Sequence, residues 1–383
     1  MFANHLIRFF TSLRLTVALL VLGLVLVFWG TMAQVNLGLY QAQNEFFRSY
    51  FIYWTPKGSS LKLPIFPGGY LLGGLLLINL LAAHFRYYRA TKKKLGIIMV
   101  HLGIVLLLAG QFLTDLLSTE STMHIRAGSS SNYSESTSRY ELAVTDTTDA
   151  AADKVVTFPD DQLRAGHELR QPELPFSLGV NVYHPNSTLT DKPDTNLVPV
   201  KTTAGFGADF WWRGLPRETA MDRRDIPSGI VEVQTPQGTR GTFLVSGYLG
   251  QPQRFAFNQR NYQIALRLRR YYKPFSLHLV EFKFDRYPGT EIPKNFSSRV
   301  RLQRTDTGED RELLIYMNNP LRYGGETFYQ ADWDHEDEKG TILQVVRNPG
   351  WLTPYFACGL VGLGLVVQFM THLAGFVSKR KTV

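Results

Sequence analysis

Residues 95–113 read LGIIMVHLGIVLLLAGQFL, and this uncharged stretch decides the fold class. A helix needs about 20 apolar residues to cross about 30 Å of hydrocarbon, because it rises only ~1.5 Å per residue. Three further uncharged runs approach or exceed that length, and they cover residues 15–32, 63–83 and 351–377. The second begins with Pro64 and Pro67, at a position where proline disturbs a helix least. We therefore predict four transmembrane helices, the first of them an uncleaved anchor.

The excess positive charge lies beside these runs. The chain has 41 Lys and Arg against 32 Asp and Glu, a net charge of +9. Ten basic residues occupy three short stretches without an acid: Arg8, Arg14, Arg86, Arg89, Lys92, Lys93, Lys94, Lys379, Arg380 and Lys381. Such clusters are typical of cytoplasmic loops rather than of a nucleic-acid surface. We expect a multi-pass protein of the bacterial inner (plasma) membrane with both termini cytoplasmic and residues 35–62 and 115–350 outside.

The expected fold is a membrane protein of mixed α and β type, with three parts. Residues 1–114 hold the first three spans and an interfacial aromatic helix at about 40–54, where Phe46, Phe47, Tyr50, Phe51 and Trp54 form one stripe. Residues 115–350 form an external, periplasmic domain rich in antiparallel β structure, since polar and apolar residues alternate over 262–268 and 280–284. Its entry, 118–138, is expected to be a poorly ordered loop. Residues 351–383 supply the fourth span and a basic cytoplasmic tail.

Cysteine content excludes several kinds of site. Cys358 is the single cysteine, so an intramolecular disulfide, a Cys-rich zinc site and an iron–sulfur cluster are ruled out. No C-x-x-C-H motif occurs, and the chain is therefore not a c-type cytochrome. A mean hydropathy of −0.10 fits a few spans diluted by a large polar domain.

Histidines inside or beside the spans are the candidates for chemistry. An ionisable group in an apolar span is costly and by default a functional hypothesis, and His101 lies six residues after Leu95. Its neutral imidazole can ligate haem iron, while the alternative is a bond to a carbonyl of the next helix. Gly103 would let a flat group or a neighbouring helix approach closely. His84 and His372 lie at span ends, where reaching water is the alternative to binding.

Other polar clusters favour structural interpretations. The acids Asp332, Asp334, Glu336, Asp337 and Glu338 around His335 match no cation-loop spacing and indicate a solvated hairpin tip. Trp211-Trp212 would face opposite ways on a strand, which favours packing over a cofactor platform. The scattered histidines His124, His167, His184 and His278 are interpreted as surface or structural residues.

Several motifs resemble those of one membrane protein family. They are Ser12-Leu13-Arg14-Leu15, Gly30-Thr31, HLGIV at 101–105, Pro274-Phe275, Tyr287-Pro288-Gly289, NPLRYGG at 319–325, Phe328-Tyr329-Gln330, and RNPG at 347–350. With this order of spans and β domain, the sequence resembles the ResB (CcsB) family of cytochrome c biogenesis proteins of the system II pathway. Residues of about 120–255 match the family only in general sequence character, without a specific motif.

The resemblance implies a component of a cytochrome c synthase that works with a CcsA-like multispanning partner. Such a component carries haem b across the membrane and presents it for covalent attachment to apocytochrome c. His101 matches the family's haem-ligating membrane histidine, so its metal contact is through haem iron only; His84 and His372 are further candidates for the haem site. The partner's tryptophan-rich motif is absent, and no catalytic residue is assigned, which leaves a non-catalytic or a co-catalytic subunit open. The alternative is a membrane-anchored β-domain that scaffolds the partner or chaperones apocytochrome without binding haem.

Overall fold

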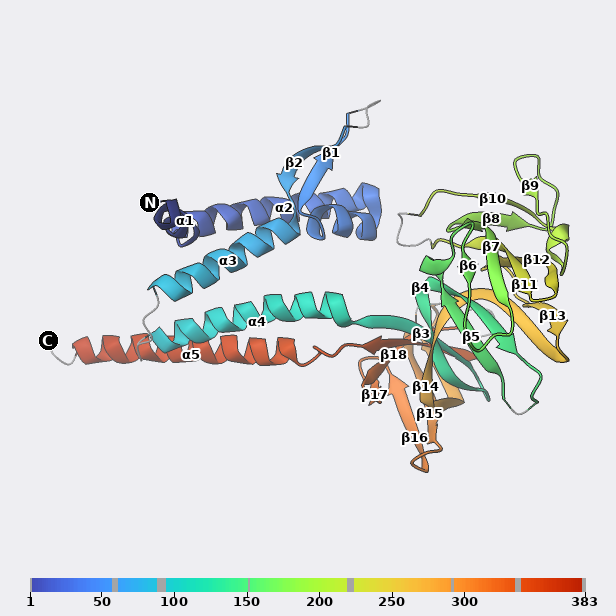
Figure 1. Cartoon of the computed structure of the whole chain (residues 1–383). Helices are drawn as coiled ribbons and strands as arrows, with labels where there is room; N and C mark the ends of the chain where they lie inside the picture. Colours follow the sequence, from blue (N-terminus) through green and yellow to red (C-terminus); the bar gives the residue numbers. More distant parts are fainter. Residues whose placement is uncertain are drawn as a thin grey trace. The chain divides into compact units, whose positions relative to one another are not determined.

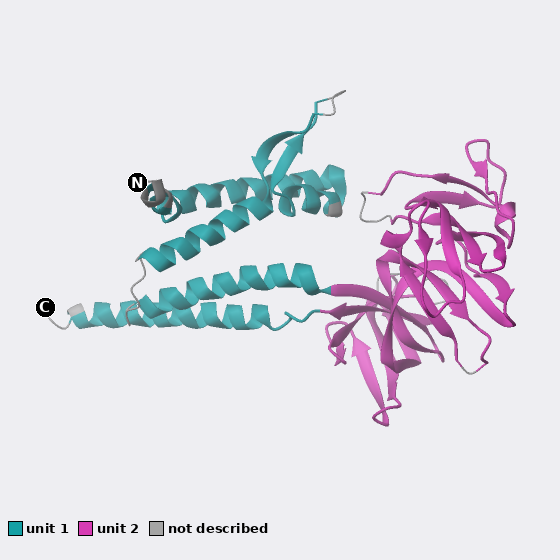
Figure 2. Cartoon of the chain, viewed as in Figure 1, with its two compact units in different colours: residues 1–118, 219–223, 348–383 teal, residues 119–218, 224–347 magenta. Residues whose placement is uncertain are grey.

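The computed structural model describes residues 2–56, 61–87, 94–150, 152–218, 224–290, 293–334 and 339–380. The chain divides into two compact units, which Figure 2 colours separately. One, here the helical unit, consists chiefly of residues 1–118 and 348–383. The other, the β unit, covers 119–218 and 224–347. The β unit follows three of the long helices along the chain and precedes the last one.

Among its described residues, the helical unit contains five α-helices (Figure 1): α1 Phe2–Phe10, α2 Leu13–Ala42, α3 Gly69–Tyr87, α4 Leu95–Leu117 and α5 Thr353–Arg380. Among the described residues four segments are long and apolar enough to cross a membrane, namely 13–39, 69–86, 95–117 and 353–378. The prediction of four such helices is confirmed. The second helix, however, begins at Gly69 and not at Leu63. Proline forces the residue before it into an extended conformation, so Leu63-Pro64 and Phe66-Pro67 form a strand instead.

The expected aromatic helix over 40–54 is wrong in its second half. Helix α2 ends at Ala42, a π-helical turn covers Gln43–Phe47, and strand β1 (Phe51–Trp54) pairs antiparallel with β2 (Leu63–Pro67). Ile52 is buried while its neighbours are exposed, which is the period of a strand. Gly68 permits this hairpin, because a Cβ there would lie 2.3 Å from the carbonyl oxygen of Ser49. Aromatic side chains suit strands as well as helices, so tertiary packing decided the outcome.

The β unit is built from strands β3 to β19, and every described pairing is antiparallel. The first nine are β3 Thr119–Arg126, β4 Ser130–Asp146, β5 Lys154–Pro159, β6 Glu168–Leu169, β7 Ser177–His184, β8 Ser187–Thr190, β9 Val198–Pro199, β10 Trp211–Gly214 and β11 Ser228–Thr235. The others are β12 Gly238–Ser246, β13 Gln253–Phe257, β14 Arg260–Arg286, β15 Pro293–Arg304, β16 Glu309–Tyr316, β17 Leu321–Tyr323, β18 Glu326–Trp333 and β19 Gly340–Arg347. The antiparallel β-rich domain is thus confirmed.

The described strands of the β unit form three sheets. The largest sheet runs β16-β15-β14-β4-β3-β19-β18-β17, with β13 added to β14 and β5 added to β4. A second sheet runs β12-β11-β7-β6, and a third runs β8-β10-β9. The expected loop over 118–138 is wrong, because β3 and the first half of β4 occupy it. Alternate side chains of β3, Ser121, Met123 and Ile125, are buried, which a Ser- and Thr-rich composition conceals.

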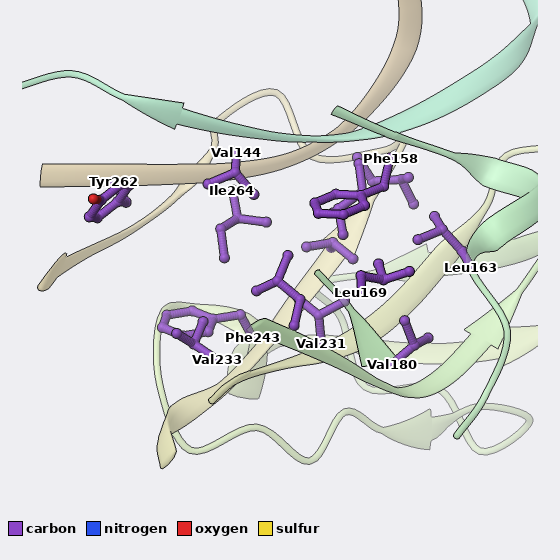
Figure 3. Close-up of a cluster of buried hydrophobic side chains, with 14 of the residues drawn as sticks. Val144, Phe158, Leu163, Leu169, Val180, Val231, Val233, Phe243, Tyr262 and Ile264 are labelled. Carbon is purple, nitrogen blue, oxygen red and sulfur yellow. The ribbon is translucent and has the colours of Figure 1, made fainter. Parts of the chain in front are cut away.

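The two largest hydrophobic cores among the described residues of the β unit share the long strand β14. The first gathers side chains from β4, β5, β7 and β11 to β14, and Figure 3 shows Ile264, Phe158 and Val233 among them. The second gathers side chains from β3, β14, β15, β16, β18 and β19. The pairing of β14 with β4 shifts register at 268–270 and 272–277. Such bulges bend a strand, and here they lie where β14 passes from one core to the other.

Candidate functional site

His101 lies on α4, and the opposite face of this helix packs against α5 through glycines. Gly96, Gly103 and Gly110 are buried and spaced seven residues apart, so they lie on one side of the helix. A Cβ at Gly103 would come within 2.5 Å of Val361 and 2.9 Å of the Ala357 carbonyl oxygen. A neighbouring helix, rather than a flat ligand, therefore occupies the space beside Gly103.

His84 meets His101 in the helical unit. Their ring centroids are 5.4 Å apart with an interplanar angle of 69°, an edge-to-face contact. His84 lies in the last turn of α3 and His101 in the second turn of α4, so the two rings meet near the end of α3 and the start of α4. Both side chains are half-buried. The two imidazoles form a pair of nitrogen donors next to apolar helix surfaces, which suits a ligand for haem iron.

His372 is not part of this pair. It is exposed on α5, and its Nε2 lies 2.7 Å from Nε2 of Gln368, one turn earlier on the same helix. Val361 packs at Gly103, next to the His101 level, and His372 follows eleven residues later, ~16 Å along the helix axis. The structure thus unites two of the three candidate membrane histidines.

The remaining polar candidates have structural surroundings. No group of three or more His, Cys, Asp or Glu able to hold a metal ion occurs among the residues that the structure describes. His124 and His167 are exposed, and His278 Nδ1 lies 3.0 Å from the Ser130 hydroxyl. His184 packs edge-on against Trp212 at 4.9 Å, and burial lowers its pKa.

Two further candidates from the sequence are the Trp211-Trp212 pair and the acidic run, of which the structure describes a part. Trp212 is 5% exposed and joins a core with Ile230 and Leu244, whereas Trp211 is only half-buried, so the packing interpretation is confirmed. Asp332 is the last residue but one of β18, Asp334 follows the strand, and residues 335–338 of the acidic run lie outside the described residues. Cys358 is exposed on α5.

The motif at 319–330 forms a hairpin. Tyr323 pairs with Glu326 across Gly324 and Gly325, whose φ values of 61° and 79° require glycine-like freedom. The ring of Tyr323 meets Phe275 edge-on at 4.8 Å, which joins this motif to Pro274-Phe275. The motif residues thus hold two distant strands together.

The sequence did not predict a buried ion pair that includes one residue of this hairpin. Lys273 Nζ lies 2.7 Å from Glu326 Oε2, and the lysine side chain is only 3% exposed. Polar and apolar residues alternate along much of β14, so a buried lysine does not stand out there. The one available signal for the ion pair was a lysine placed directly before Pro274-Phe275.

The comparisons with known proteins agree with the motifs. Residues 237–342 match the model of the ResB-like family. Protein NrfI of Wolinella succinogenes is 30% identical over 305 residues, which are 79% of this chain and 30% of that protein. The chain belongs to the ResB-like family. "Cytochrome c biogenesis protein CcsB" of Prochlorococcus marinus is 41% identical over 58 residues, 15% of this chain and 13% of the relative. "Cytochrome c biogenesis protein CCS1, chloroplastic" of Arabidopsis thaliana is 35% identical over 72 residues, 19% and 12% of the two chains.

The ResB-like match has a definite place in the structure. It begins at the β11–β12 turn and ends within β19, so it covers the 319–330 hairpin and the residues that β14, β15, β16 and β18 contribute to the second core. His84 and His101 lie outside it. The ResB-like chain spans less than a third of NrfI and about an eighth of CcsB.

Proposed function

We propose that this ResB-like chain is a haem-handling component of a cytochrome c synthase. It carries haem across the inner membrane and presents it to apocytochrome c, together with a CcsA-like partner. Two observations support the proposal: relatives named as cytochrome c biogenesis proteins, and the contact of His84 with His101 at 5.4 Å between apolar helices. The contact between the two histidines is the observation on which the proposed haem role rests.

His101 is the proposed axial ligand for the haem cargo. A neutral imidazole offers a nitrogen lone pair to iron, and a protonated one does not. His101 and His84 are in direct ring contact, so each ring limits the orientation of the other. We assign His84 the role of holding the His101 ring until haem arrives, and the partner the second axial bond. His372 has no role in this scheme.

The proposal includes an orientation. Both termini and the 87–94 connection are cytoplasmic, because the three acid-free basic stretches lie there, and the β unit is periplasmic. In that orientation His84 and His101 lie toward the cytoplasmic ends of α3 and α4, where haem would enter. The β unit then faces the compartment in which apocytochrome receives its haem.

The test is His101→Ala in the full chain purified with its CcsA-like partner. Haem per complex, measured from the absorption spectrum, and cytochrome c maturation should both fall at least several-fold, because one iron bond is lost. Added imidazole should restore part of both, since it is small and neutral enough to replace the missing ring near neutral pH. His372→Ala and the exposed His124→Ala are matched controls and should retain haem.

A scaffold without haem is the second candidate function. The observation that favours it is the position of the family match, which lies in the β unit and excludes the membrane histidines. Unchanged haem per complex in His101→Ala, with maturation reduced only in proportion to protein level, would select the scaffold.

A further inference from the structure

A cavity of about 430 Å³ lies between α1 and the end of α3, within the helical unit. Its lining is almost entirely apolar: Ile7, Phe10, Thr11, Ile78, Ala82, Phe85 and Arg86. Arg86 is the single charged residue of that lining. Neither His84 nor His101 belongs to that lining. The cavity is therefore separate from the histidine pair.

The walls of this cavity are held by a buried amide. Asn79 on α3 is 2% exposed, and its Nδ2 donates to the Phe10 carbonyl at 2.7 Å and to the Ser12 carbonyl at 3.3 Å. Thr16 completes the arrangement by donating to Asn79 Oδ1 at 2.6 Å. Thr11 caps α1 through its bond to the Ile7 carbonyl at 2.8 Å. These bonds pin the α1–α2 junction against α3, so the cavity is a built feature.

The lining and the location indicate a lipid chain as the occupant. Helix α3 is long and apolar enough to cross a membrane, and the cavity lies on its surface near one end. Phe85 at the cavity is 89% exposed and Ile7 is 47% exposed, so large apolar surfaces flank the opening. At the end of a membrane-spanning helix such surfaces lie against acyl chains.

The charge around the cavity selects the headgroup. Arg86 lines the cavity, and Arg8 and Arg14 are exposed on the neighbouring α1 and α2. No acidic residue occurs in α1, α2 or α3, so these helices bring no negative side chain to the cavity. Arginine binds phosphate with two parallel hydrogen bonds, and basic pockets between transmembrane helices attract anionic headgroups.

We propose that this cavity binds one anionic phospholipid, with an acyl chain against Ile78, Ala82 and Phe85 and the phosphate at Arg86. The lipid would join α1 to α3 at one membrane face. This binding site is independent of the haem role, because neither His84 nor His101 contributes to it.

The experiment measures lipid retained by the purified full chain in native mass spectrometry, after equilibration with equal amounts of palmitoyl-oleoyl phosphatidylglycerol and phosphatidylcholine. We expect one phosphatidylglycerol retained per chain, with at least a several-fold preference over phosphatidylcholine. Arg86→Gln should abolish the preference, and Ala82→Phe should reduce retention of both lipids by filling the cavity. Two matched controls should bind as wild type: Arg380→Gln, an arginine at the end of α5, and Leu81→Phe, which adds a ring on an exposed face of α3.

Equal retention of the two lipids by wild type would overturn the proposal, since it indicates annular lipid only. An identical effect of Arg86→Gln and Arg380→Gln would do the same, because it indicates general charge attraction. Displacement of the lipid when the CcsA-like partner binds would assign the cavity to a partner helix instead. If Ala82→Phe does not fold, Arg86→Gln still tests the headgroup claim. A normal haem content in Arg86→Gln would separate this site from the proposed haem role.

Discussion

Lys273 places a charged ammonium in the interior of the β unit. Its side chain is 3% exposed, and its Nζ forms an ion pair with Glu326 Oε2 at 2.7 Å. Removing one member of a buried pair leaves an uncompensated charge, so Glu326→Leu should lower the free energy of unfolding by about 3–5 kcal/mol. Replacing both, Lys273→Met with Glu326→Leu, should restore most of that loss. Denaturant unfolding of the wild type and both variants measures this, and Glu168→Gln at the exposed Arg170 pair is the control that should change little.

His184 should make the stability of the β unit depend on pH. Burial lowers its pKa from 6.5, so the folded state favours the neutral ring. The contribution is therefore complete above about pH 6.5 and is lost as the pH falls through the lowered pKa. His184→Phe retains a ring against Trp212 and removes the titration. The drop in Tm between about pH 7.5 and 5.5 should be smaller in this variant than in wild type, and an equal drop would contradict the assignment.

At the scale of elements, the α4–α5 pair depends on close approach of two helix backbones. A Cβ on Gly364 would lie 2.8 Å from the Gly96 carbonyl oxygen and 2.9 Å from the Val100 nitrogen, next to His101. Gly362, two residues earlier, has nothing within 4 Å of its Cβ position. Gly364→Ala should therefore destabilise the protein by about 1–3 kcal/mol through overpacking.

Gly362→Ala is the matched control, and it should be neutral or stabilising by up to about 1 kcal/mol because alanine favours a helix. Thermal unfolding of the full chain in one detergent compares the two. Equal Tm values for the two variants would mean that α5 does not pack on α4 through this face.

At the scale of the whole molecule, the distribution of charge predicts the orientation of the chain. Reporter fusions after Lys94 and after Lys381 should report the cytoplasm, and fusions within 150–340 should report the periplasm, because the acid-free basic stretches remain inside. A cytoplasmic β unit would contradict both the orientation and the proposed access to apocytochrome.

Much of the architecture could be predicted from the sequence, since the relevant free energies are local. Transfer of a side chain into hydrocarbon depends on the residue itself, so contiguous apolar runs indicated four long helices without knowledge of their partners. Alternation at period 2 likewise indicated strands around Tyr262 and Phe282. The motif HLGIV and the NPLRYGG turn indicated the family, because they resemble motifs of its members.

Other features were decided only by which distant residues meet. Residues 51–54 have an aromatic pattern that suits a helix, yet they pair as a strand with 63–67, where prolines prevent a helix. Strand β3 was concealed by its hydroxyl residues, whose alternate side chains are buried by neighbouring strands.

The candidate site follows the same division. The sequence indicated His101, His84 and His372 one at a time, because an ionisable residue in or beside an apolar run is conspicuous by itself. Only the tertiary structure brought His84 to His101 and left His372 on another part of α5. It alone showed that Gly103 serves the approach of α5, and that Lys273 is buried against Glu326. Hydrophobicity and period belong to short segments of chain, whereas a contact between side chains depends on the packing of elements far apart in the sequence.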